Sequence, residues 1–300
     1  MFYEIRKWGD VTEREVWIMR SNHEVIVPNE DLPFKMFLFE GEHGNYFRER
    51  HWHQSIEIFA VFQGDLVFYL NDLELRLKSG DFILVNSNEI HAIYSPEPNQ
   101  VVVIQIPLNA LSHYFTADQY LCFTHEARET DTQVMGLIRE MFTAYKKRGI
   151  GYDMLVKSRY YMLLYLLVSS YRELEVSDEL LRQNRKLNKL TPITNYMKEH
   201  YQEELSLETL AEKFGYAPAY LSRMFQKYAG INYKDYLQSV RVKYALAELN
   251  RGECTVSEAA LKHGFSDSRA FAKVFQKKYG MLPSEYLRKR LKDFPGMEKN

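Results

Sequence analysis

Cysteine is nearly absent from this sequence, and so are long runs of apolar residues. The 300 residues include only Cys122 and Cys254, which are too few for a disulfide framework and make no zinc-binding spacing. The longest uncharged apolar run, residues 160–171, is well short of the ~20 residues that span a bilayer. The first residues also lack the apolar stretch of a secretion signal. We therefore expect a cytoplasmic protein with reduced thiols and no membrane among its partners.

Net charge is also nearly absent, at −1 overall, but it is divided unevenly along the chain. Residues 1–180 hold 17 Lys and Arg against 27 Asp and Glu, whereas residues 181–300 hold 22 against 13. An acidic part joined to a basic part indicates a polyanionic partner for the basic part. The length predicts two domains, each large enough for a core of its own.

The last third of the chain repeats one helical pattern, with an offset of 49 residues up to the glycine of the turn and 50 after it. In each copy a small residue permits close helix approach, and a glycine four residues later suits a tight turn. The pattern predicts two helix-turn-helix motifs. The matched pairs are Leu207 and Val256, Ala211 and Ala260, Gly215 and Gly264, Leu221 and Phe271, Phe225 and Phe275, and Gly230 and Gly280.

Residues 233–250 lie between the copies and form one continuous helical pattern. As a helix this segment is ~27 Å long, which is near the ~34 Å that separates successive major-groove faces. The second helices of both copies could therefore enter adjacent major grooves on one side of a duplex.

Residues 191–290 thus resemble the DNA-binding domain of the AraC/XylS family of bacterial transcription regulators, and residues 280–288 resemble its terminal signature. The resemblance implies that the partner is double-stranded DNA, with RNA polymerase as a further partner if the protein is an activator. Carried over residue by residue, it places DNA contacts on the exposed faces of the two second helices. These residues are Ala219, Ser222, Arg223 and Gln226 in the first copy, and Ser268, Arg269, Lys273 and Gln276 in the second.

Residues 1 to about 110 are typical of short strands and turns. Residues 66–70 and 73–77 flank Asn71-Asp72, a two-residue hairpin loop, and residues 82–85 and 101–106 are further apolar strands. Many short strands predict a barrel or a sandwich. Two helical patterns follow, and residues 154–171 are apolar on most faces, as in a helix buried between neighbours or in a dimer interface. We expect a homodimer through this helix.

His51, His53 and Glu57 alternate in a pattern that predicts one face of a strand, and His91 follows the strand at 82–85 in a turn. These four residues resemble the signature of the cupin barrel, where such side chains converge on a metal. The departures are Asn86 and Asn88, where the cupin pattern prefers Pro and Gly. Because Asn tolerates the same turn conformations, we expect the fold to be retained and the cluster to converge.

Three interpretations of His51, His53, Glu57 and His91 remain open. The cluster could bind a small organic effector, and a carbohydrate is a plausible class because carboxylates and imidazoles bond hydroxyl groups. It could instead bind a divalent metal such as Zn, Mn or Fe. Apart from such a metal, we expect no cofactor. It could also be a hydrogen-bonded structural cluster without a ligand.

The sequence predicts a mixed fold: an N-terminal β-barrel, cupin- or jelly-roll-like, and an all-α C-terminal domain with two helix-turn-helix motifs. We place a cupin-like effector-binding domain at 1–130, a helical dimerisation region at 131–180, a linker at 181–191 and the AraC-type DNA-binding domain at 192–292. The expected function is effector-responsive transcription regulation without enzymatic activity. The alternatives are a metal-dependent cupin enzyme fused to a DNA-binding domain and an architectural DNA-binding protein without an effector.

Overall fold

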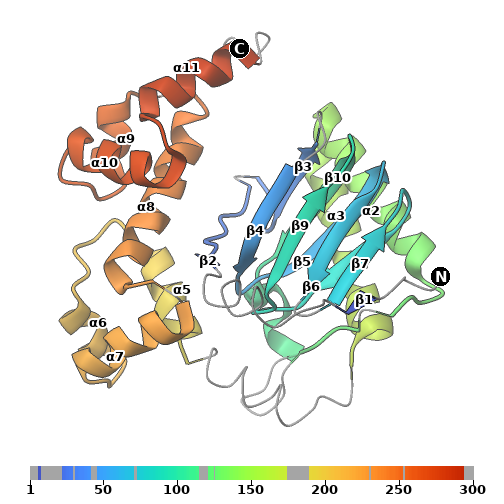
Figure 1. The fold of residues 1–300 in the computed structure, drawn as a ribbon, viewed down its shortest axis with the longest axis horizontal. Helices are drawn as coiled ribbons and strands as arrows, with labels where there is room; N and C mark the ends of the chain where they lie inside the picture. Colours follow the sequence, from blue (N-terminus) through green and yellow to red (C-terminus); the bar gives the residue numbers. More distant parts are fainter. Residues whose placement is uncertain are drawn as a thin grey trace. The chain divides into compact units, whose positions relative to one another are not determined.

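The computed structural model places the chain in two compact units, residues 1–185 and 186–300 (Figure 1). It describes residues 6–7, 22–29, 31–41, 46–70, 73–114, 121–124, 126–173, 189–229, 231–252 and 254–293. The expected hairpin loop at 71–72 and linker residues 181–188 lie outside the described residues. Within the part of the chain that is described, no helix is both long and apolar enough to cross a bilayer.

The strands of the first unit form two sheets. Sheet A has the order β1-β7-β6-β9-β4-β2, and sheet B has the order β3-β10-β5-β8. The strand pairs are antiparallel except for the short parallel pair of β2 with β4. The prediction of an N-terminal β-structure followed by an all-α part is confirmed. The strands are β1 (Arg6–Lys7), β2 (Asn22–His23), β3 (Lys35–Glu40), β4 (Tyr46–Trp52), β5 (Ile56–Gln63), β6 (Leu66–Leu70), β7 (Leu73–Leu77), β8 (Phe82–Val85), β9 (His91–Ser95) and β10 (Gln100–Ile106).

Sheet B is buried on both faces. On β5, Phe59 and Val61 belong to the core between the two sheets, whereas Ile58 and Ala60 belong to a second core formed with the helices. Strand β10 alternates in the same way, which explains why both strands are apolar at nearly every position. The helices behind sheet B in Figure 1 are α2 (Asp131–Lys147) and α3 (Tyr152–Leu166), preceded by the 3-10 segment η1 (Leu108–Tyr114) and followed by the π-helical turn η2 (Leu167–Tyr171).

The second unit contains two helix pairs joined by a long helix. The helices are α5 (Thr191–Glu199), α6 (Leu207–Lys213), α7 (Pro218–Met224), the π-helical turn η3 (Phe225–Ala229), α8 (Tyr233–Leu249), α9 (Val256–Lys262), α10 (Ser268–Tyr279) and α11 (Pro283–Asp293). α6 and α7 form the first pair, and α9 and α10 form the second. The side chain of Ser206 caps α6, and Thr255 and Glu258 form a capping box at α9. The sequence thus defines the beginning of each pair locally.

The two pairs bury corresponding apolar residues. Ala211, Leu221 and Phe225 of the first pair are fully buried, as are their counterparts Ala260, Phe271 and Phe275. The copies differ after the first two turns of the second helix. α7 ends at Met224 and continues as the π-helical turn η3, whereas α10 remains an α-helix as far as Tyr279. The wider turn changes the angular positions of the residues that follow it.

The glycines at the two turns have similar backbones and different surroundings. Gly215 has φ +69°, and a Cβ added to it would meet nothing within 4 Å. Gly264 has φ +82°, and a Cβ there would lie 2.9 Å from Arg241 Nε and 3.0 Å from Gln202 O.

We expect Gly215→Ala to lower the free energy of unfolding by about 1–2 kcal/mol, the cost of a left-handed non-glycine residue. Gly264→Ala should cost measurably more, and equal losses in urea unfolding would contradict this difference in packing.

Candidate functional site

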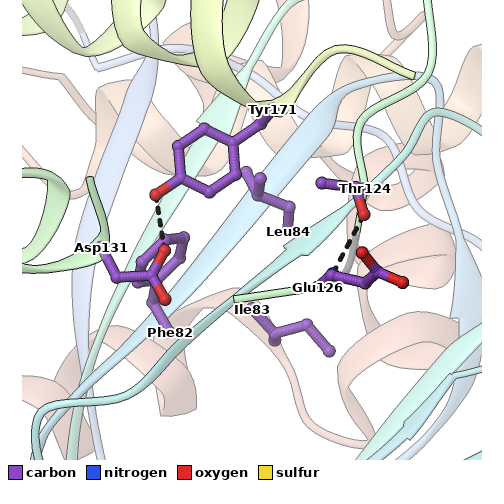
Figure 2. Close-up of a pocket in the computed structure, with 7 residues that line it drawn as sticks. All are labelled: Phe82, Ile83, Leu84, Thr124, Glu126, Asp131 and Tyr171. Carbon is purple, nitrogen blue, oxygen red and sulfur yellow. Dashed lines mark hydrogen bonds between the residues drawn. The ribbon is translucent and has the colours of Figure 1, made fainter. Parts of the chain in front are cut away.

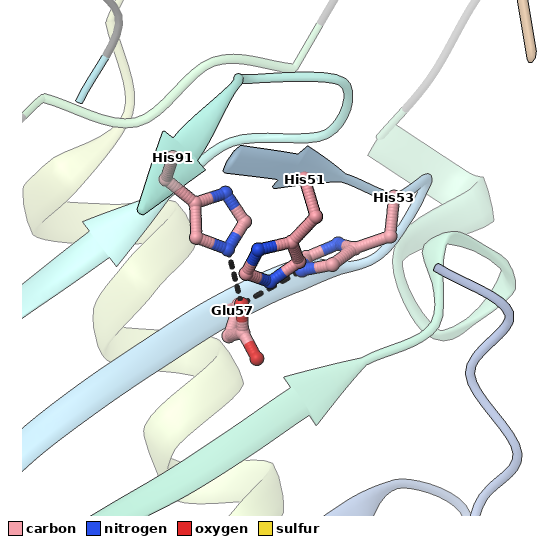
Figure 3. Close-up of side chains that lie close together, drawn as sticks. All are labelled: His51, His53, Glu57 and His91. Atoms are coloured by element: carbon pink, nitrogen blue, oxygen red, sulfur yellow. Dashed lines mark hydrogen bonds and ion pairs between the residues drawn. The ribbon is translucent and has the colours of Figure 1, made fainter. Parts of the chain in front are cut away.

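Four polar side chains converge between the two sheets of the first unit, and they are the four singled out in the sequence (Figure 3). Their potential ligand atoms all lie within 4.8 Å of one another. The assumption of a single strand was wrong, however. His51 is the penultimate residue of β4 in sheet A, Glu57 lies on β5 of sheet B, and the chain crosses between the sheets at residues 53–55. The residues converge because both strands turn these positions towards the space between the sheets.

His91 also lies elsewhere than expected. It is the first residue of β9, and it pairs directly with His51 in sheet A. A register shift in the β4–β9 pairing separates Arg48 from His51, and such irregularities redirect side chains. The pairing brings the two imidazole centroids to 4.1 Å, with His53 at 5.1 Å from His91.

All three imidazoles are oriented in the same way by the backbone. The Nδ1 atoms of His51, His53 and His91 lie 2.9, 2.9 and 3.0 Å from carbonyl oxygens of Glu49, Ser55 and Glu89. A carbonyl can only accept, so each Nδ1 carries the proton and donates it. Each Nε2 therefore points away from the backbone, and those of His53 and His91 approach the carboxylate of Glu57.

Glu57 is 1% exposed and lies at the centre of the cluster. Its Oε2 lies 2.7 Å from His53 Nε2 and 3.0 Å from His91 Nε2, while its Oε1 accepts a 2.7 Å hydrogen bond from Gln105 Nε2. Burial alone would raise the pKa of Glu57, but the charges and hydrogen bonds of His53 and His91 outweigh it and hold this pKa well below its usual range. Glu57 is therefore a carboxylate.

His51 is the cluster member nearest to the acidic residue Glu24, with 3.6 Å between Nε2 and Oε2. Burial, followed by the proximity of His91 and Arg48, lowers the pKa of His51 to about 3. His51 is thus a neutral imidazole at physiological pH, with a proton on Nδ1 and a lone pair on Nε2.

The donor set fits a divalent cation. A neutral histidine that donates from Nδ1 presents a lone pair at Nε2, and a lone pair facing a carboxylate oxygen is repulsive unless a proton or cation lies between them. His91 Nε2 is buried 3.0 Å from Glu57 Oε2, so a proton or a cation must lie between these two atoms. Imidazoles held by Nδ1 donation to carbonyls are typical of metal ligands. His51, His53, Glu57 and His91 would supply three nitrogens and one carboxylate.

Two asparagines and one glutamine support the cluster. Asn86 binds both the N–H and the C=O of Phe123, and Asn88 adopts φ +68° while its N–H donates to His53 O. Asn therefore does occupy a left-handed position in this turn, as expected for Asn88. Gln105, which orients Glu57, was missed by sequence analysis. It lies opposite Glu57 in the β10–β5 register, and 48 residues separate the two in the sequence.

A second, small pocket lies where β8 meets the end of η2 (Figure 2). Tyr171 donates a 2.6 Å hydrogen bond to Asp131 there, with Phe82 and Leu84 beneath. The pocket has room for about one water molecule. It is therefore too small for an organic effector, and we assign it a structural role.

The DNA contacts suggested by the sequence lie on α7, η3 and α10. Arg223, Gln226, Arg269, Lys273 and Gln276 are exposed, as is the small Ala219, while Ser222 and Ser268 are half-buried. Tyr220, 38% exposed on α7, was missed; its counterpart on α10 is Ala270. The two exposed faces therefore differ in chemistry, although the buried faces match.

Comparison with known families supports both units. Residues 33–164 match the model of an AraC-like ligand binding domain, and residues 210–289 match that of a helix-turn-helix domain. An uncharacterized HTH-type transcriptional regulator of Staphylococcus aureus (strain COL) is 22% identical over 77% of this chain and 31% of its own length. Another, YijO of Escherichia coli (strain K12), is 38% identical over 32% of this chain and 34% of its own length. The chain thus spans about a third of the curated relatives it matches.

Solved structures show the same fold at low sequence identity. ToxT from Vibrio cholerae superimposes with a TM-score of 0.55 and 17% identity, covering 85% of this chain and 98% of that one. A form of ToxT described as bound to an unsaturated fatty acid gives a TM-score of 0.54. These matches establish a common fold for most of the chain.

The lowered pKa of His51 predicts a loss of stability on acidification. Between pH 6.5 and pH 3 the unfolded chain binds a proton at His51 that the folded chain does not, so the free energy of unfolding falls as pH falls. The slope from this residue is about 1.4 kcal/mol per pH unit below pH 6. We expect His51→Gln to remove this contribution to the slope. The free energy of unfolding is measured in urea by tryptophan fluorescence, which reports on the first unit because all three tryptophans lie within residues 1–52. His200→Gln is the control, and an unchanged slope in His51→Gln would refute the assignment.

Proposed function

Because the chain belongs to the AraC family of transcription regulators, we propose that it binds double-stranded DNA through both helix pairs and responds to a ligand in its first unit. The observation that supports DNA binding is the duplicated arrangement of α7 and α10. α7 together with η3, and α10, each bury an apolar face and expose cationic and amide side chains on the other. The proposed role is regulatory, without catalysis, and RNA polymerase is a further partner if the protein is an activator.

The exposed side chains have the chemistry of base recognition in the major groove. Arg223 and Arg269 carry the bidentate donors that suit guanine, and Gln226 and Gln276 can bond adenine. Lys273 suits guanine or phosphate, and Ser222 and Ser268 suit either base edges or the backbone. Ala219 offers only a methyl group. The second pair therefore supplies more polar contacts than the first.

Arg223→Ala tests base recognition by the first pair. We expect the variant to lose about 1–3 kcal/mol of binding free energy and to relax sequence preference at one base pair. Binding is measured at fixed salt on a site selected from random duplexes and on its single-base variants. Lys213→Ala, on α6, is the matched control because it removes a cation of the same helix pair. Equal weakening on all sequences would make Arg223 a phosphate contact only.

The apolar outer face of α3 supports a homodimer. Met154, Tyr161 and Tyr165 are 73, 63 and 64% exposed and follow one another at steps of seven and four residues, which places them on one side of the helix. Leu155 and Met162 extend this face, whereas Leu164 of the same helix is buried in the core formed with sheet B. Exposed apolar surface of this kind is typical of protein–protein interfaces.

A charge placed on this face should prevent dimerisation. We expect the wild-type protein to be a dimer at micromolar concentration by light scattering, and Tyr161→Glu to be a monomer with the same circular dichroism spectrum. Burying an unpaired carboxylate in an apolar interface is strongly unfavourable, whereas exposing it in a monomer costs little. Lys146→Glu, on the exposed surface of α2, is the control. A monomeric wild-type protein, with and without DNA, would refute the dimer.

Two classes of ligand are proposed for the His51–His53–Glu57–His91 cluster. An organic effector with hydroxyl groups, such as a carbohydrate, would use imidazole and carboxylate as hydrogen-bonding partners. A divalent metal is favoured by a specific observation: the Nδ1 atoms are engaged by carbonyls and Glu57 Oε1 by Gln105, so the Nε2 atoms of the three histidines and Glu57 Oε2 remain as one converging set of donors. A bound metal would take the place of the protons shared between these atoms and would link the two sheets. A cupin enzyme fused to a DNA-binding domain would additionally show turnover.

The double variant His53→Ala/Glu57→Ala separates these possibilities. We expect DNA affinity without ligand to be unchanged and the transcriptional response in a reporter strain to be lost. A metal site predicts near-stoichiometric metal in the wild-type protein by elemental analysis, loss of that metal in the variant, and the same loss of response on chelation. An organic site predicts no metal and no effect of chelation. A stable, metal-free variant with a normal response would overturn the assignment of this site.

A further inference from the structure

The two helix pairs of the second unit are joined by a buried polar junction as well as by α8. Tyr201 belongs to the segment between α5 and α6, and its hydroxyl lies 2.9 Å from Nδ1 of His263, at the end of α9. His263 Nε2 lies 2.6 Å from Oε2 of Glu248 on α8, and Lys262 donates to the other oxygen of Glu248 at 2.6 Å. The junction therefore connects residues that are 62 positions apart in the sequence.

The hydrogen bonds of the junction have a single consistent direction. The carboxylate of Glu248 can only accept, so His263 Nε2 carries the proton, and Nδ1 accepts from the hydroxyl of Tyr201. Burial lowers the pKa of His263, which agrees with a neutral ring. Tyr201, His263 and Glu248 are 8, 5 and 7% exposed. At this depth a donor or acceptor that loses its partner is costly, so the geometry is tightly specified.

Contacts of the backbone reinforce the junction. Arg241, on α8, donates from Nε to Tyr201 O at 2.7 Å and from Nη2 to Glu203 O at 2.8 Å. The absence of a side chain at Gly264 lets the turn of the second pair approach this loop closely. The ring of Tyr201 is nearly parallel to that of Tyr244, with centroids 4.3 Å apart. The loop before the first pair is thus held directly against the turn of the second.

We propose that Tyr201 and His263 are positioning residues that fix the angle and separation between α7 and α10, so that the protein accepts only one spacing between its two DNA sub-sites. One base pair changes the separation of the sub-sites by ~3.4 Å and their relative rotation by ~35°. α8 alone, a single helix that can bend and twist, would absorb part of such a change. Directional hydrogen bonds across the junction resist it. This inference rests on the proposed function, because it assumes that both pairs bind DNA.

The test measures affinity against spacing. The full-length wild-type protein selects a site from random duplexes, and one or two base pairs are then inserted or deleted between its two sub-sites. We expect the wild-type protein to lose about tenfold in affinity or more for each base pair, the cost of one disrupted base contact. Tyr201→Phe should lose less than about threefold in affinity for each base pair, because the angle between α7 and α10 is held less firmly without the Tyr201 hydroxyl. Phe225→Leu, which reduces the core of the first pair without touching the junction, is the control and should keep the steep dependence.

A second variant separates positioning from stability. Tyr201→Phe/His263→Leu/Glu248→Leu replaces all three buried partners by apolar groups, so that no buried donor or acceptor of the junction is left unpaired, and the free energy of unfolding is largely kept while the directional hydrogen bonds are lost. We expect this variant to unfold at nearly wild-type urea concentrations and still to tolerate altered spacing. A spacing dependence that follows stability alone, being steep in the triple variant and weak in Phe225→Leu, would overturn the proposal.

Failure of this inference can be distinguished from failure of the proposed function. Unchanged steepness in Tyr201→Phe, or a selected site with only one sub-site, would overturn the role of the junction while DNA binding stands. Failure of the wild-type protein to select any duplex would overturn both.

Discussion

The burial of sheet B on both faces is the constraint on which the first unit depends. Because β5 and β10 divide their side chains between two cores, a polar residue in the interior of the face towards sheet A is cut off from water. Glu57 and Gln105 lie on that face, and a carboxylate there needs donors or cations around it. The crossing from β4 to β5 brings His53, and the start of β9 brings His91. The cluster surrounds one acid in an otherwise dry interior.

Residue type and spacing were sufficient to find the four members of this cluster, but not to explain how they meet. The alternation of His51, His53 and Glu57 continues in phase through the crossing at 53–55, so the sequence looks like one strand. Gln105 could not be predicted, because its partner is defined by the register of β10 against β5. The repeated helices were easier, since turn glycines and apolar spacing are local properties that survive duplication.

The second unit shows where a repeat stops being informative. Core positions match between the copies, yet α7 gives way to the π-helical turn η3, and α10 does not. The contact of Tyr201 with His263 has no counterpart in the repeat pattern, because it joins one copy to the other. Such contacts are set by how the two copies pack against α8, and periodicity within each copy carries no information about that packing.

The unequal exposed faces of α7 and α10 have a consequence for how a promoter is read. Where one helix carries Ala219 and Tyr220, the other carries Arg269 and Ala270. If both helices contact bases, the sequence bound by a single protomer is asymmetric and has a defined orientation on the duplex. Inverting that sequence in front of a gene would turn the bound protein around, so that the surface facing the start of transcription would be a different one.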